Sequence, residues 1–236
     1  MRCGITGLRP TYGRVPRTGA MTLCWSLDKL GPMTRSVEDA LLVLQAITGP
    51  DPGDLQCVPS KLDYDANASV KGLRVGYFPK WMKEAPATDV DRAALETVKK
   101  VGMVPVEVSI PDWPYQSLNL ILFAESAAAF EELTLSGEAD QLKVQTYDAW
   151  PNLFRQSRFL SAVDFVQTDR LRRRVAEART DWAPDPSRPI AKFSPPRRVP
   201  HGVTLIGRLF EEGTLGRACL ALERAFNVVA EHPPGF

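Results

Sequence analysis

The pattern that most limits the fold lies in residues 73–109, where two short apolar runs flank a helical segment. Residues 73–78 predict a strand, because β-branched and aromatic side chains favour a pleated backbone. Asp89 is placed to cap a helix over residues 90–101. Residues 104–108 predict a second strand, with Pro105 at an edge or a strand start. Strand, helix and strand at this spacing predict a βαβ crossover with parallel strands, and therefore an α/β fold.

The rest of the chain predicts helices joined by loops. Ser36, followed by an acidic residue three positions later, is typical of a helix start. Further helices are expected over residues 117–136, 160–179 and 214–230. Val203-Thr204-Leu205-Ile206 predicts a short strand. We expect one partial domain over residues 1–236, made of an extended loop (1–35), helices with the βαβ unit (36–180), a proline-rich connector (181–200) and a closing strand and helix (201–236).

Composition excludes several classes of protein. The chain has 44% hydrophobic and 24% charged residues, which is typical of a globular protein. Its 29 basic and 28 acidic residues give a net charge of +1, so we expect no nucleic-acid partner and no attraction to an anionic membrane. The most apolar stretch, residues 118–130, contains Asn119 and Glu125 and is too short to span a bilayer. The first residues have no apolar leader, and we expect a cytoplasmic protein.

The cysteines and histidines do not predict a metal or nucleophile site. Cys3, Cys24, Cys57 and Cys219 are far apart, with no Cys-x-x-Cys pair, so we expect reduced thiols, no metal and no cofactor. The only two histidines, at positions 201 and 232, accompany no Gly-x-Ser-x-Gly motif and predict surface positions. Cys3 has no histidine or lysine near it in the sequence, which favours an inert, buried thiol.

Two consecutive blocks at the start of the chain carry a specific resemblance. Residues 3–15 read Cys-Gly-Ile-Thr-Gly-Leu-Arg-Pro-Thr-Tyr-Gly-Arg-Val. Residues 26–40 read Ser-Leu-Asp-Lys-Leu-Gly-Pro-Met-Thr-Arg-Ser-Val-Glu-Asp-Ala. Together they resemble the tail of the amidase signature, and residues 72–110 and 201–223 resemble later segments of the same family. The resemblance implies a mixed central β-sheet covered by helices.

The resemblance also implies a chemistry, namely hydrolysis of a carboxamide C–N bond. In the family a serine nucleophile acts with a second serine in a cis peptide and a lysine, and backbone N–H groups stabilise the oxyanion. These residues precede the Cys-Gly-x-x-Gly-Leu block, in a stretch rich in glycine and serine. No Gly-Gly-Ser-Ser or Gly-Gly-Ser segment occurs in the 236 residues, and Ser26 and Ser36 do not match the family positions. We therefore assign no catalytic residue and expect a truncated chain, inactive on its own.

Three hypotheses follow from this resemblance. The first is the C-terminal part of an amidase acting on a small-molecule amide. The second is an A-like subunit of a glutamyl-tRNA amidotransferase, and the third is a non-catalytic binding or scaffold remnant. A homo-oligomer or a partner subunit is compatible with each. If any residues line the ancestral pocket, loop 4–35 is the best place, and the residues expected there are Arg9, Thr11, Tyr12 and Arg14.

Overall fold

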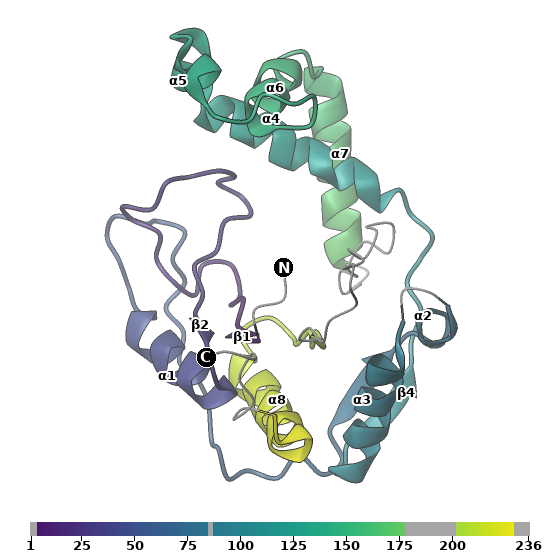
Figure 1. Cartoon of the computed structure of the whole chain (residues 1–236). Coiled ribbons are helices and arrows are strands. Elements are labelled where there is room, and N and C mark those ends of the chain that lie inside the picture. The colour runs from purple at the N-terminus through teal and green to yellow at the C-terminus, as the bar shows by residue number, and fades with distance from the viewer. Residues whose placement is uncertain (1–3, 85–86, 178–201, 229–236) are drawn as a thin grey trace. The chain divides into compact units, whose positions relative to one another are not determined.

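The computed structural model describes residues 4–84, 87–177 and 202–228, and these fall into two compact units (Figure 1). The first unit takes in Met1–Thr18, Lys29–Ser109 and Trp182–Phe236. The second takes in Gly19–Asp28 and Ile110–Asp181. Both units are therefore built from stretches that are discontinuous in the sequence.

Two helices from distant parts of the sequence pack together in the first unit. They are α1 (Val37–Ile47) and α8 (Glu212–Phe226). Val37 and Leu41 of α1 form a buried cluster with Leu220 of α8, and Gly216 gives α1 room to approach, because a Cβ there would lie 2.5 Å from a methyl carbon of Leu41. A short antiparallel pair, β1 (Thr6–Gly7) and β2 (Met33–Thr34), lies before α1. Ser36 caps α1 as predicted, since its Oγ accepts the Asp39 N–H at 3.1 Å.

The βαβ unit follows in the same part of the molecule. Strand β3 (Arg74–Tyr77) pairs in parallel with β4 (Val104–Glu107), and α3 (Asp89–Lys100) connects them. A short helix, α2 (Pro79–Lys83), precedes α3. Val98 of α3 and Met103 form a second core cluster with Ala218 and Leu222 of α8. Helix α8 therefore joins both halves of the unit into one core.

The second unit is helical. Its elements are η1 (Tyr115–Leu118), α4 (Asn119–Ala129), α5 (Glu131–Leu135), η2 (Glu138–Gln141), α6 (Trp150–Ser157) and α7 (Ala162–Glu177). Helix α4 contacts both α6 and α7 (Figure 1). The Phe130 ring stacks on Phe154 of α6 with 4.7 Å between the ring centroids.

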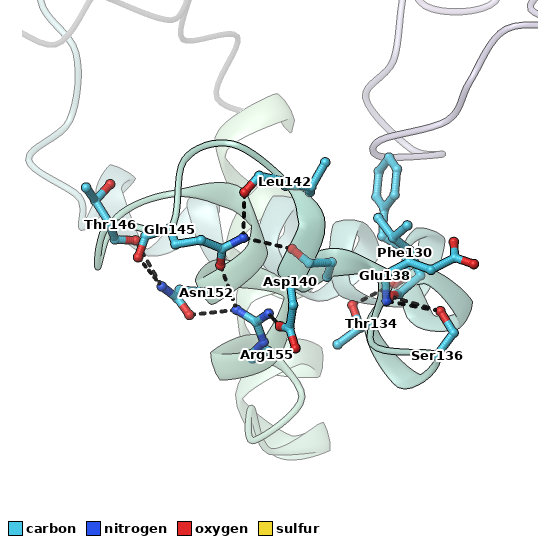
Figure 2. A network of polar contacts seen from close by, with 12 residues as sticks. Phe130, Thr134, Ser136, Glu138, Asp140, Leu142, Gln145, Thr146, Asn152 and Arg155 are labelled. Carbon is cyan, nitrogen blue, oxygen red and sulfur yellow. Dashed lines mark hydrogen bonds and ion pairs between the residues drawn. The ribbon is translucent and has the colours of Figure 1, made fainter.

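Polar side chains hold the segment between η2 and α6 in place (Figure 2). Gln145 Nε2 donates to the carbonyls of Ala139 and Leu142, at 2.9 and 2.8 Å. Asn152 Nδ2 donates to the carbonyls of Gln145 and Thr146. Arg155 then ties this network to Asp140 by an ion pair. The segment lacks long regular structure, and these side-chain hydrogen bonds give its backbone a defined path.

The structure corrects three local predictions. The helix expected over residues 117–136 is broken at Phe130, where that ring turns onto Phe154. The N-cap of α3 is Thr88 and not Asp89, and its N–H donates to Asp91 at 2.7 Å. The strand expected at Val203–Ile206 is wrong, because among the described residues no strand pairs with it.

The α/β class is confirmed, with the sheet present as two separate two-stranded pieces among the described residues. The predicted single partial domain stays a prediction. The connector at 181–200, Cys3 and both histidines lie outside the described residues. None of the helices that the structure describes combines the length and apolar character needed to cross a bilayer.

Candidate functional site

The loop of the first signature block is fixed to the start of α8 by a buried polar network. We call Thr11, Arg14, Phe210 and Glu212 the Arg14 network. Arg14 is 0% exposed and Glu212 is 3% exposed, and 2.8 Å separates Arg14 Nη2 from Glu212 Oε2. Arg14 Nη2 also donates to the Phe210 carbonyl at 3.0 Å. Thr11 completes the network, since its N–H donates to Glu212 Oε1 at 2.7 Å and its Oγ1 accepts the Phe210 N–H at 2.8 Å.

The electrostatics of the Arg14 network favour the charged form of Glu212. Burial raises the pKa of Glu212, but the hydrogen bonds from Thr11 and the attraction of Arg14 outweigh it, so this pKa lies below its ordinary value. The Arg14 guanidinium also lies 5.3 Å from the centroid of the Phe210 ring. Phe210 itself has a φ of 60°, which is strained for a residue with a side chain. The network therefore holds a costly backbone conformation in place.

Tyr12 belongs to a second cluster, which we call the Tyr12–Arg17 cluster and which also contains Asp54 and Gln56. The Arg17 guanidinium lies 4.7 Å from the Tyr12 ring centroid, and it binds Asp54 through Nε and Nη2 at 3.0 and 3.2 Å. Gln56 Oε1 accepts from both Tyr12 Oη and Arg17 Nη2. The side-chain hydrogen bond from Arg17 is the main cause that lowers the pKa of Asp54 to about 2. Lys29 Nζ is 5.7 Å from the Tyr12 ring centroid, so two cations flank this aromatic ring.

The sequence-predicted pocket residues therefore have different surroundings. Thr11 and Arg14 lie together in the Arg14 network, where Arg14 is shielded from solvent. Tyr12 is half-buried in the Tyr12–Arg17 cluster, and Arg9 is exposed. Sequence reasoning missed Glu212, because nothing near it in the sequence indicates that its partner is Arg14.

A third polar cluster lies in the second unit, and no sequence motif indicates it. The Glu125 carboxylate of α4 accepts the Ser26 N–H at 2.9 Å, the Ser26 hydroxyl at 2.5 Å and the Cys24 thiol at 3.2 Å. Arg172 of α7 donates to Ser26 Oγ at 2.6 Å and pairs with Asp169 at 2.5 Å. We call Cys24, Ser26, Glu125 and Arg172 the Glu125 cluster. It ties loop 19–28 to two helices.

The Glu125 cluster is built to hold a loop and not to activate a nucleophile. Burial, followed by the neighbouring Glu125, raises the pKa of the Cys24 thiol to about 11, so this thiol stays protonated at neutral pH. Among the described residues, the side chains that hydrogen-bond to Ser26 are those of Glu125 and Arg172, and the Cys24 sulfur lies 4.0 Å from Ser26 Oγ. Within residues 4–84, 87–177 and 202–228, no group of three or more His, Cys, Asp or Glu side chains could hold a metal ion.

Comparison with known protein families matches residues 2–182 to the family described as Amidase. Among curated proteins, the A subunit of glutamyl-tRNA(Gln) amidotransferase from Roseiflexus castenholzii is 37% identical over 148 residues, which cover 60% of this chain and 30% of that protein. The corresponding protein from Staphylococcus aureus is 38% identical over 133 residues, covering 54% of this chain and 27% of the relative. This chain thus spans less than a third of the length of these relatives.

Solved structures share the fold. Peptide amidase from Stenotrophomonas maltophilia has a TM-score of 0.68 at 21% identity, covering 99% of this chain and 60% of that one. A bacterial aryl acylamidase of the amidase signature family has a TM-score of 0.70 at 18% identity, covering 98% of this chain and 61% of that one. A structure described as part of a vestigial protein complex, linked to the origins of an s-triazine catabolic enzyme, has a TM-score of 0.59 at 26% identity, covering 74% of this chain and 38% of that one.

Proposed function

Because this chain belongs to the amidase family, we propose that it forms part of an enzyme that hydrolyses a carboxamide C–N bond. The observation that carries the proposal is the family match over residues 2–182, which spans both signature blocks. No position in the printed sequence matches the serine nucleophile, the second serine or the lysine that the resemblance implies. Turnover therefore requires a segment that carries these three residues in addition to the 236 residues of this chain.

The role of this chain in such an enzyme is to support and shape the site. The Arg14 network fixes the loop that follows the nucleophile segment in the family. Of the four residues expected to line the pocket, Arg9 is exposed and Tyr12 is half-buried, whereas Arg14 is shielded. We propose that Arg9 and Tyr12 face the substrate. Thr11 and Arg14 then attach the loop to Phe210 and Glu212 at the start of α8.

The test measures ammonia release from simple carboxamides by two preparations. The chain alone should release no more than a heat-treated control. Co-expression with an amidase-family segment that carries the serine nucleophile, the second serine and the lysine should restore release, and replacing the nucleophilic serine of that segment by alanine should abolish it. Release by the chain alone would show that its own residues are sufficient. A soluble, assembled pair without activity would contradict the hydrolase proposal.

A second candidate is an amidotransferase subunit that releases ammonia from glutamine. The 37% identity to the A subunit of a glutamyl-tRNA(Gln) amidotransferase favours it. The assay is co-purification with a B-type subunit, followed by glutamine-dependent amidation of glutamyl-tRNA. Failure to co-purify would favour the simple amidase, and saturable binding of an amide without turnover would favour the non-catalytic alternative.

A further inference from the structure

A groove lies between α8 and the loop that precedes β3, away from both polar networks of the first unit. Residues 66–70 form one wall, and Arg217, Leu220, Ala221 and Arg224 of α8 form the other. Its volume is about 360 Å³, which is within the range of small-molecule sites. Leu220 and Arg224 are one helical turn apart, and Arg217 and Arg224 are two turns apart, so all three lie on one face of α8.

The floor of the groove is part of the core and does not have to form on binding. Leu220 is 4% exposed and packs with Val37 and Leu41, and Ala66 packs against the same cluster. Val70 packs against the second cluster of the unit. A site whose apolar floor is fixed in this way loses little conformational freedom when a ligand binds.

The loop wall is also held by its own turns. Asp65 Oδ1 accepts the Asn67 N–H at 2.8 Å, and the Asp65 carbonyl accepts the Ala68 N–H at 3.3 Å. Ser69 Oγ accepts the Lys71 N–H at 3.1 Å. These are the local hydrogen bonds of Asx and serine turns, which give a loop a defined shape.

The charge at the rim of the groove is positive. Among the described residues, neither Arg217 nor Arg224 forms an ion pair; Arg217 donates to Thr214 Oγ1 at 3.2 Å. The wall residues include no acidic side chain. The neighbouring acid on α8, Glu223, accepts the Val37 N–H at 2.9 Å and also attracts Arg224. Arg217 has no such acidic neighbour among the residues that line the groove. Two guanidiniums above an apolar floor match an anion that also has an apolar body.

We propose that this groove binds a small organic acid, with its carboxylate on Arg217 or Arg224 and its apolar chain on Leu220, Ala221 and Val70. The proposal does not depend on amide hydrolysis, because none of these residues belongs to the Arg14 network or the Tyr12–Arg17 cluster. The occupant differs from the amide substrate of the proposed function in carrying a charge.

The experiment titrates octanoate, acetate and inorganic phosphate into the whole chain, with calorimetry as the readout. Octanoate should bind saturably and more tightly than acetate or phosphate, because only octanoate uses the apolar floor. The double variant Arg217→Gln/Arg224→Gln should weaken octanoate binding by at least about tenfold, as expected for loss of a charge-assisted hydrogen bond. Ala221→Phe should abolish binding by filling the groove while both arginines remain.

Arg208→Gln is the matched control, since Arg208 lies in the same unit, is 82% exposed in its side chain and does not line the groove. It should bind octanoate like the original chain, and circular dichroism should show that all variants keep the same helix content. Absence of saturable octanoate binding would overturn the proposal. Equal binding by all variants, or phosphate binding as tight as octanoate, would also overturn it.

Discussion

Arg14 and Glu212 come from distant parts of the sequence and form a buried ion pair, with 2.8 Å between Nη2 and Oε2. Both residues are almost fully shielded from solvent. Removing one partner of such a pair leaves the other charge buried without compensation, which is more costly than losing an exposed pair. The pair is therefore the contact whose loss should most weaken the attachment of the first signature block to α8.

Glu212→Gln tests this attachment. The substitution keeps an oxygen for the Thr11 N–H but removes the charge that balances Arg14, so we expect a loss of about 3–5 kcal/mol in the free energy of unfolding. Urea unfolding followed by circular dichroism measures it. Asp89→Asn removes the exposed partner of Arg92 and should change the same quantity by no more than about 1 kcal/mol. Similar losses in the free energy of unfolding for both variants would mean that burial does not make the Arg14–Glu212 pair more important for stability than an exposed pair.

The same pair predicts a dependence on pH. The pKa of Glu212 is lower in the folded chain than its ordinary value, so its contribution to stability is present above the unfolded pKa of about 4.3 and is lost as the pH falls through the folded pKa. The urea midpoint of the original chain should therefore decrease below about pH 4. Glu212→Gln should show a smaller decrease over that interval, and an identical decrease in both proteins would contradict the assignment to Glu212.

The sequence predicted the elements better than the contacts between them. The βαβ unit and helix α1 have strong local signals, namely apolar periodicity and capping residues, and helices α7 and α8 were also expected close to their observed positions. The helix break at Phe130 coincides with a ring contact to Phe154, and residues 203–206 lack a partner strand among the described residues, so neither result was visible locally. The partners of Arg14 and Ser26 are also distant in the sequence, and a single sequence carries no record of such pairs.

Asp54 provides a direct measure of the Arg17 contact. Its pKa is lowered to about 2, mainly by the side-chain hydrogen bond from Arg17. In Arg17→Gln we expect the pKa of Asp54 to rise toward its ordinary value of about 3.9, and carbon NMR of the carboxyl group can follow the titration. Because the folded pKa is depressed, the stabilisation is present above about pH 3.9 and is lost as the pH falls toward 2. An unchanged pKa in Arg17→Gln would exclude Arg17 as the cause.

Glu125→Ala tests the anchoring of loop 19–28. The change removes the acceptor of the Ser26 N–H and of the Cys24 thiol, so the loop should open more often and Cys24 should become accessible. Alkylation of Cys24 by iodoacetamide, read by peptide mass spectrometry, should accelerate at least about tenfold, which corresponds to ~1.4 kcal/mol. Glu132→Ala removes an exposed carboxylate of α5 and serves as the control, with no change expected. Equal rates in the two variants would mean that Glu125 does not hold the loop.

Gly213→Ala tests the close approach at the start of α8. A Cβ at Gly213 would lie 1.5 Å from the Asp63 carbonyl oxygen, so the backbone has to move. We expect a destabilisation of at least about 1–3 kcal/mol, as for overpacked cores, despite the better helix propensity of alanine. Gly49→Ala, with no neighbour within 4 Å of its Cβ, should change the free energy of unfolding by less than about 0.5 kcal/mol. Thermal unfolding of both variants distinguishes a steric effect from a general effect of alanine.

The long separation between Arg14 and Glu212 also has a consequence for synthesis on the ribosome. Arg14 is synthesised long before Glu212, its only acidic partner among the described residues. At a synthesis rate of about 5–20 residues per second, on the order of 10–40 s pass between the addition of Arg14 and the addition of Glu212. The loop of the first signature block lacks this contact with α8 during the interval, so the nascent chain is more exposed to chaperones and proteases until α8 has been made.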